Sequence, residues 1–213
     1  MGLLIDKTIK EFSDLLASRE PAPGGGSTAA LSGALAASLT VMVAELSFGK
    51  KSYEALEDGI KSRFRDESEE AERLRTVFLN LVDEDTKAFN VYMDALKMPA
   101  ETEAERTKRA ESMEQASLAT LNVPLEVAEN CVRILKNQHT VAEYGNKNAA
   151  SDIGVGALLA FTGLEGAVLN VKINLPAISD EKIKRTALKR TAEYLREAEE
   201  LKADIMRIVN SRM

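Results

Sequence analysis

Residues 149–171 read AASDIGVGALLAFTGLEGAVLNV, and this stretch is the strongest indication of the fold class. It is too long for a single strand and too apolar for a loop, so it predicts a buried helix. Small residues recur along it at spacings of four, three and four: Gly156, Ala160, Gly163 and Ala167. These spacings place them on one helix face. Glycine within a helix costs about 1 kcal/mol relative to alanine, so either close helix packing or a ligand slot between helices is expected there.

The rest of the chain shows helical periodicity, without a hairpin signal, an internal repeat or a low-complexity linker. Further helices are expected over residues 3–18, 27–48, 65–96, 102–135 and 180–213. Ser27 or Thr28 is expected to cap the second of these helices, and Pro124 predicts a kink or break. We therefore expect an all-α protein, a single multi-helical domain over residues 1–213 with long antiparallel helices.

Composition excludes several classes of protein. Hydrophobic residues make up 45% of the chain and charged residues 29%, which is typical of a globular protein and not of a disordered one. The net charge of −6 argues against a nucleic-acid partner. Cys131 is the sole cysteine, so a disulfide within the chain is impossible and a cytoplasmic location is expected. The uncharged segment 27–44 is long enough to span a membrane, but its many Ser, Thr, Gly and Ala residues favour burial in protein.

Four polar clusters adjoin the apolar helices, and the first is a glycine loop. It consists of Gly24, Gly25, Gly26 and Ser27, which follow Pro23 and open a helix. Free backbone N–H groups and the positive end of the helix dipole at such a loop suit a carboxylate or phosphate. A plain capped loop explains the same residues equally well.

The second cluster centres on Asp85. Leu81, Asp85 and Phe89 lie four residues apart and share one helix face. A carboxylate among such neighbours loses water, which raises its pKa toward values useful for proton transfer. The alternative is that Asp85 points into solvent with its charged neighbours.

The third cluster leads into the 149–171 helix. It comprises Asn146, Lys147, Asn148, Ser151 and Asp152. Asn148 and Asp152 are four residues apart and line one face of the first turns. Helix capping explains the asparagines but does not explain an acid at the mouth of so apolar a helix, so Asp152 is a candidate functional residue.

The fourth cluster, Asn170 with Lys172 and Asn174, lies at the far end of the same helix. Asparagine can hydrogen-bond the edge of a planar heterocycle, but it also suits a helix C-terminus and turn. His139, the sole histidine, has Glu143 four residues on and no further His or Cys to complete a metal site, so we expect no metal.

Five motifs resemble the cyclodeaminase/cyclohydrolase family, which includes the cyclodeaminase half of formiminotransferase-cyclodeaminase and free-standing methenyltetrahydrofolate cyclohydrolases. They occur in the family's order over nearly the whole chain: PAPGGGS at 21–27, DTKAF at 85–89, NVPLEVAE at 122–129, GNKNAASDIGVGA at 145–157 and EGAVLNVKINL at 165–175. The resemblance implies an all-helical homodimer and a tetrahydrofolate substrate. The transferase half has no counterpart here, so the resemblance implies action alone or beside a separate formiminotransferase.

The chemistry of that substrate suggests roles for the motif residues. The methenyl carbon bridges N5 and N10 as an amidinium-like cation, which a carboxylate can stabilise while it accepts a proton from attacking water. We assign Asp152 as the main acid/base and Asp85 as its partner in one dry crevice. Asn148, Asn170 and Asn174 would orient the rings, the 24–27 loop would hold a tail carboxylate or a ring edge, and Lys147 and Lys172 would attract the anionic tail. Deaminase and hydrolase chemistry, and any polyglutamate preference, stay open at this stage, as does a non-catalytic helical dimerisation module.

Overall fold

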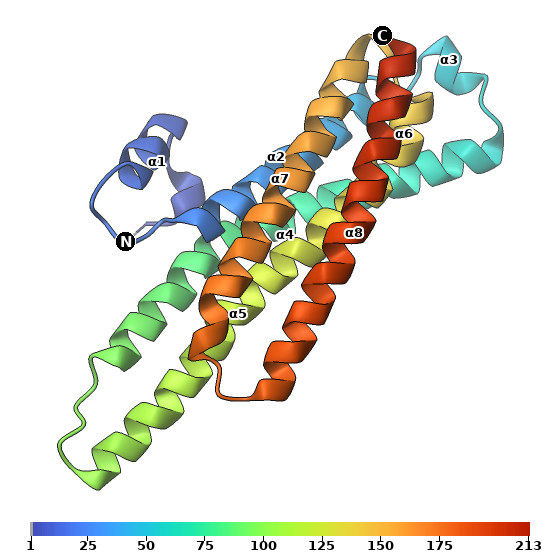
Figure 1. Ribbon diagram of the computed structural model, residues 1–213. Coiled ribbons are helices and arrows are strands. Elements are labelled where there is room, and N and C mark those ends of the chain that lie inside the picture. The colour runs from blue at the N-terminus through green and yellow to red at the C-terminus, as the bar shows by residue number, and fades with distance from the viewer. Residues whose placement is uncertain (1) are drawn as a thin grey trace.

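The long apolar segments become the central helices of a bundle in the computed structural model, which describes residues 2–213 (Figure 1). Over that range the elements are η1 (Leu4–Asp6), α1 (Ile9–Leu16), α2 (Gly25–Glu45), α3 (Lys51–Glu54), α4 (Asp58–Leu96), α5 (Glu103–Asn137), α6 (His139–Tyr144), η2 (Lys147–Ala149), α7 (Ala150–Asn174), η3 (Leu175–Ala177) and α8 (Glu181–Arg212). The described residues contain no strand. The prediction of an all-α fold is confirmed.

Helix α2 lies in the middle of the bundle, between α4 and α7 (Figure 1). The small-residue face of α7 permits a close approach: a Cβ atom added at Gly163 would lie 2.9 Å from the Ala29 carbonyl oxygen and 3.3 Å from the Gly33 nitrogen. At Gly156 the corresponding atom would lie 3.4 Å from the Ala36 carbonyl oxygen. Gly156 and Gly163 therefore serve close packing of α7 on α2, and α2 backbone atoms occupy the space next to these two glycines.

Two antiparallel helix pairs build the rest of the bundle (Figure 1). Helix α4 ends at Leu96, before Pro99, and α5 returns along it from a capping box of Thr102 and Glu105. Helices α7 and α8 form the second pair, joined through η3. Pro124 lies within α5 without ending it, so of the predicted kink or break the break is wrong. Packing of α5 against α4 and α7 compensates for the lost backbone hydrogen bond.

Several helix boundaries differ from the prediction. Helix α2 begins at Gly25 with Gly24 at the N-cap position, because the Ser27 side chain bonds to α4 and is not available to cap its own helix. The expected helix over 3–18 is divided by a capping box at Thr8, so α1 is a short helix beside the bundle that buries no residue fully. Helix α4 starts at Asp58, seven residues before the predicted boundary at Arg65.

The two most apolar helical segments, Gly25–Glu45 and Lys147–Ala177, are long enough to cross a membrane by length and composition. In the bundle 56% and 50% of their most apolar windows are buried. Each segment thus has one face in the protein core and one outer face. Cys131 is fully buried, as expected for a small apolar residue, and burial raises the pKa of its thiol.

Candidate active site

A pocket of about 300 Å³ opens where α2 begins, between α4, α5 and the last turns of α7. Its lining combines the proline–glycine loop with two of the other predicted clusters: Pro21, Ala22, Gly24, Gly25, Gly26, Asp85, Phe89, Thr120, Asn170, Ile173 and Asn174. The structure therefore brings together residues that are as far apart in the sequence as Gly25 and Asn174. We call this space the glycine pocket.

Asp85 is the sole acidic side chain among the residues that line the glycine pocket. The Asp85 side chain is half-buried, and its Oδ2 atom lies 2.9 Å from the hydroxyl oxygen of Ser27. The Ser27 hydroxyl donates a hydrogen bond either to this Oδ2 atom or to the Val82 carbonyl oxygen, which is also 2.9 Å away. The alternative that Asp85 points into solvent is thus wrong. Its position follows from the predicted face, because Leu81 one turn earlier is buried and Phe89 one turn later lines the pocket.

Burial raises the pKa of Asp85 above the ordinary range of an aspartate, since the charged form loses water. Hydrogen bonds from the side chain and backbone of Ser27 act in the opposite direction and lower the pKa, but by less than burial raises it. The result is a carboxylate held in one position whose proton affinity is higher than that of a free aspartate. A raised pKa makes such a group a better proton acceptor than a free aspartate, and its fixed position lets it return the proton to the same place.

The start of α2 explains how the carboxylate comes so close to the backbone. A Cβ atom added at Gly26 would lie 2.0 Å from Asp85 Oδ1, so only glycine leaves room for this contact. The loop was predicted to hold an anion, and the anion at this helix N-terminus is Asp85 itself. Two ligand groups were predicted for the loop, a tail carboxylate and a ring edge. The negative charge of Asp85 would repel the carboxylate, whereas it does not oppose a ring edge.

Two asparagines form the opposite wall. The Asn170 side chain donates to the Gly166 carbonyl oxygen at 2.8 Å, and Asn174 donates to the Thr120 carbonyl oxygen at 2.6 Å. Each amide therefore has its NH₂ group partly engaged and its oxygen available to a ligand N–H. Lys172 is exposed, and it is absent from the pocket lining.

The third predicted cluster lies elsewhere. Asp152 is in the first turn of α7, and at about 1.5 Å per residue it is roughly 27 Å along the helix from Asn170. Lys147, Asn148 and Ser151 are exposed at that same end of α7. The expectation that Asp152 and Asp85 share one crevice is therefore wrong for a single chain, because a continuous helix separates them.

Asn146 serves a structural purpose at that end of the bundle. Its backbone N–H donates to the Ser47 hydroxyl oxygen at 2.7 Å, and its side chain donates to the Leu46 carbonyl oxygen and accepts from the Asn148 N–H. These contacts tie η2 to the end of α2. Capping, the simpler of the two explanations for this residue, is confirmed.

Thr120 and Ile173 line the pocket although no sequence pattern marked them as candidate site residues. Thr120 precedes the 122–129 motif, and Ile173 lies between Asn170 and Asn174, which were predicted site residues. Closeness to these motifs in the sequence is the one feature that could have indicated that both residues line the pocket. A larger cavity of about 600 Å³ lies near Phe48. Its charged lining is four glutamates, Glu45, Glu54, Glu69 and Glu72, against one arginine, Arg65, so its net negative charge disfavours an anionic ligand. Among residues 2–213 no group of three or more His, Cys, Asp and Glu side chains is placed to hold a metal.

The fold and the pocket define the class as an all-helical bundle that holds a half-buried carboxylate at a pocket lined by glycines and asparagines. The family model described as formiminotransferase-cyclodeaminase matches residues 8–193. The chain belongs to this family, and it is therefore an enzyme of the cyclodeaminase/cyclohydrolase type. The resemblance seen in the sequence motifs is confirmed.

Three relatives illustrate the similarity. The methenyltetrahydrofolate cyclohydrolase of Methylorubrum extorquens is 36% identical over 208 residues, which cover 98% of this chain and 98% of that protein. The formimidoyltransferase-cyclodeaminase of Gallus gallus is 32% identical over 98% of this chain, which spans only 38% of the longer protein. The crystal structure of a formiminotetrahydrofolate cyclodeaminase from Thermotoga maritima superposes with a TM-score of 0.81 at 29% identity, covering 96% of each chain.

Proposed function

We propose that this enzyme hydrolyses 5,10-methenyltetrahydrofolate to 10-formyltetrahydrofolate and that the glycine pocket holds the reacting carbon. The observation that carries the proposal is the Asp85 carboxylate, fixed by Ser27 and with its pKa raised by burial. The full-length similarity to a methenyltetrahydrofolate cyclohydrolase supports hydrolysis as the reaction.

The reaction needs one group that can accept and return a proton. Water adds to the cationic carbon between N5 and N10, and Asp85 takes one proton from it. The C–N5 bond then breaks, N5 receives the proton from Asp85, and the remaining hydroxyl loses its proton as the formyl C=O forms on N10. One proton is released overall, so Asp85 returns to its starting state. Its negative charge also stabilises the cation that it faces before water attacks.

The other residues of the glycine pocket would place the substrate. The amide oxygens of Asn170 and Asn174 are available to pterin N–H groups, and Phe89 offers an apolar surface for a ring. Exposed Lys172, just outside, would attract the anionic glutamate tail. We also propose that the chain acts as one domain over residues 1–213, as a homodimer in the cytoplasm, with any formiminotransferase supplied by another protein.

Ammonia release from 5-formiminotetrahydrofolate is the second candidate. The similarity to the Thermotoga maritima cyclodeaminase favours it. In that reaction N10 attacks the formimino carbon and the leaving nitrogen needs a proton, which protonated Asp85 could supply, since burial raises its pKa.

Two assays on the purified protein distinguish the candidates. The first follows loss of the methenyl chromophore, and the second measures ammonia released from the formimino substrate. Turnover of the methenyl substrate without ammonia release from the formimino compound supports the hydrolase, and ammonia release supports the deaminase. Absence of both activities in a folded, helical protein would refute the proposed function.

A further inference from the structure

The Ser27 hydroxyl, near the start of α2, lies among three oxygen atoms of α4. Its Oγ atom is 2.9 Å from the Val82 carbonyl oxygen, 2.9 Å from Asp85 Oδ2 and 3.3 Å from Thr86 Oγ1. A serine hydroxyl has one proton to donate and two lone pairs that accept. It can therefore form a full hydrogen bond as donor to Val82 or to Asp85 at one time, but not to both. Among residues 2–213, no other side chain donates a hydrogen bond to Asp85.

The heavy atoms around this hydroxyl have fixed positions. Ser27 is fully buried, and the Val82 carbonyl belongs to the backbone of α4. The backbone of α2 lies against the carboxylate as well, since a Cβ atom added at Gly26 would be 2.0 Å from Asp85 Oδ1 and 2.7 Å from its Oδ2. The hydroxyl proton is the part that can move, because rotation about the Cβ–Oγ bond displaces the proton and no heavy atom.

The protonation state of Asp85 decides which oxygen receives this proton. An ionised carboxylate can only accept, and hydrogen bonds that involve a charged group are roughly twice as strong as neutral ones, so the hydroxyl donates to Asp85 Oδ2. Once Oδ2 carries a proton, it becomes a donor to Ser27 Oγ. The Ser27 hydroxyl then turns and donates to the Val82 carbonyl oxygen. The Thr86 hydroxyl, at 3.3 Å, can donate to the remaining lone pair of Ser27 in both states.

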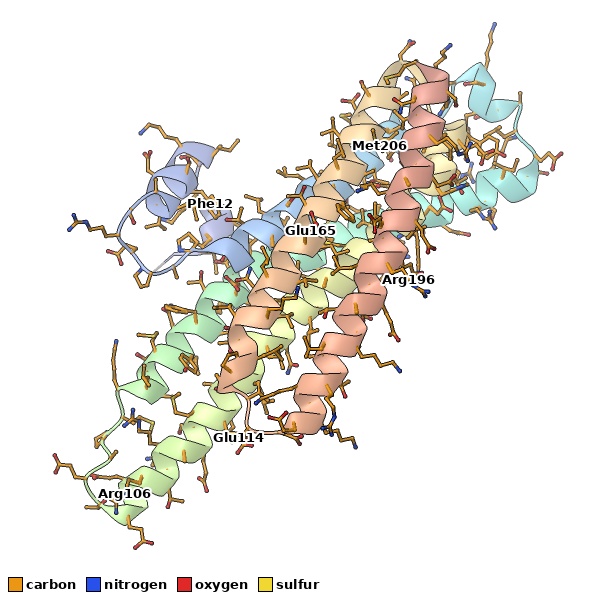
Figure 2. The ribbon with its side chains drawn as sticks, in the orientation of Figure 1. Phe12, Arg106, Glu114, Glu165, Arg196 and Met206 are labelled. Carbon is orange, nitrogen blue, oxygen red and sulfur yellow. The ribbon has the colours of Figure 1, made fainter. Side chains whose placement is uncertain are left out.

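The glycine pocket offers Asp85 no charged partner from residues 2–213. Asp85 is itself the sole charged residue in the pocket lining. On α4, Asp83 bonds to the N-terminal segment and Glu84 pairs with Lys87. On α7, Glu165 lies near the middle of the bundle and is absent from the pocket lining (Figure 2). The contact that changes when Asp85 takes up a proton is therefore the hydrogen bond at its Oδ2 atom.

We propose that Ser27 is a positioning residue for Asp85, and that its hydroxyl switches between Asp85 and the Val82 carbonyl oxygen as Asp85 loses and gains a proton. The switch keeps a hydrogen bond at Oδ2 in both states, so the carboxyl group stays in one place between accepting a proton from water and returning it to N5. The proton from water travels on Asp85 alone, and the O–H bond of Ser27 is not broken. This inference rests on the proposed function and adds how its acid/base group is held through the reaction.

Ser27→Ala removes the switch and leaves the rest of the side chain in place. Both states of Asp85 then lose a partner, but the ionised state loses the stronger bond, so the pKa of Asp85 should rise further. The difference between a charged and a neutral hydrogen bond corresponds to about one pH unit, or roughly a tenfold change in proton affinity. The acid limb of the pH profile of methenyl turnover should move upward by that amount. Turnover at the optimum pH should fall roughly 10- to 100-fold, because the carboxyl group is no longer held in place.

The matched control is Ser32→Ala, which is also on α2. The Ser32 hydroxyl donates to the Leu159 carbonyl oxygen of α7 at 2.8 Å, and Ser32 is absent from the lining of the glycine pocket. Each variant therefore loses one hydroxyl-to-carbonyl contact between helices, and both should remain helical. Ser32→Ala should keep the turnover and the pH profile of wild type. An unshifted pH profile in Ser27→Ala, or the same shift in both variants, would overturn the proposal.

NMR of the ¹³C-labelled aspartate carboxyl groups follows the same titration without turnover. The Asp85 resonance is identified by its absence from Asp85→Asn. Its titration midpoint should lie about one pH unit higher in Ser27→Ala than in wild type or Ser32→Ala. If the midpoint shifts while wild-type enzyme turns over neither folate substrate, the proposed function fails and the hydrogen-bond switch stands. If wild type is active and the midpoint does not move, the function stands and the switch is wrong.

Crystal structures of wild type test the switch without any substitution. Crystals are equilibrated below and above the titration midpoint of Asp85. The distance between Ser27 Oγ and Asp85 Oδ2 should stay near 2.9 Å at both pH values, since one atom or the other donates. A protonated carboxyl group that turns away from Ser27 would overturn the proposal.

Discussion

Replacing Gly26 with alanine should disable the enzyme while leaving it folded. The new Cβ atom would lie 2.0 Å from Asp85 Oδ1, 2.5 Å from its Cγ and 2.7 Å from its Oδ2. Carbon atoms in contact are normally about 3.5–4.0 Å apart, so the carboxylate must move by more than about 1 Å or the start of α2 must shift. Either change separates Asp85 from the Ser27 hydroxyl, which is now 2.9 Å away.

The two expected effects differ in size. Overpacking costs about 1–3 kcal/mol of folding free energy, and alanine recovers up to about 1 kcal/mol as the better helix former, so the net loss is modest. A displacement of about 1 Å at a reacting group can reduce turnover roughly 100-fold. Turnover should therefore fall far more than stability does.

The assay compares methenyl turnover and urea unfolding for wild type, Gly26→Ala and Gly59→Ala. Gly59 is the control because it also lies in the first turn of a helix and its added Cβ would meet nothing within 4 Å. We expect wild-type turnover for the control. Wild-type turnover in Gly26→Ala would refute the argument that the glycine exists to admit the Asp85 carboxylate.

Three further outcomes are expected. Because burial raises the pKa of Asp85, the native state holds its proton to higher pH than the unfolded state does, and this residue's contribution to stability is lost as pH rises through the raised pKa. The stability of Asp85→Asn in urea unfolding should therefore gain on that of wild type as pH rises above the ordinary aspartate pKa of about 3.9, and a difference that stays constant with pH would contradict this. Asp83→Ala removes the buried carboxylate that accepts the Leu4 N–H hydrogen bond at 2.6 Å, which should cost about 1–3 kcal/mol of folding free energy. Trypsin should then cleave the chain before α1 faster than in wild type. An unchanged cleavage rate would show that this hydrogen bond does not hold the N-terminal segment on α4. Gly163→Ala places a Cβ atom 2.9 Å from the Ala29 carbonyl oxygen and should destabilise the bundle by about 1–3 kcal/mol in urea unfolding, whereas equal stability would show that α2 and α7 can separate freely.

The sequence predicted the parts of the fold and site that depend on local periodicity. The spacing of Leu81, Asp85 and Phe89 correctly indicated a half-buried carboxylate, and the small-residue face of α7 correctly indicated close packing. The predicted helix starts were less accurate where a capping side chain forms its hydrogen bond with a residue that is distant in the sequence. Ser27 is a good N-cap residue in isolation, but its hydroxyl bonds to Val82 and Asp85 of α4, which lie 55 and 58 residues further along the chain.

The grouping of Asp152 with Asp85 failed for a physical reason that was already visible in the sequence. Asp152 and Asn170 belong to one continuous helix, and the rise of such a helix, about 1.5 Å per residue, separates its ends by more than the length of a small ligand site. Which of the two ends meets Asp85 depends on the direction in which α2 and α7 pack. That direction is a tertiary property, and no local spacing encodes it.

In the proposed reaction Asp85 is the group that accepts and returns the proton at the folate carbon. The direct measurement is turnover of 5,10-methenyltetrahydrofolate by Asp85→Asn, beside Glu84→Gln, which neutralises the exposed neighbouring acid that pairs with Lys87. Loss of a general acid/base reduces rates by about 100- to 10,000-fold, so we expect that loss in Asp85→Asn and near wild-type rates in Glu84→Gln. Retention of wild-type turnover by a folded Asp85→Asn enzyme would contradict the account.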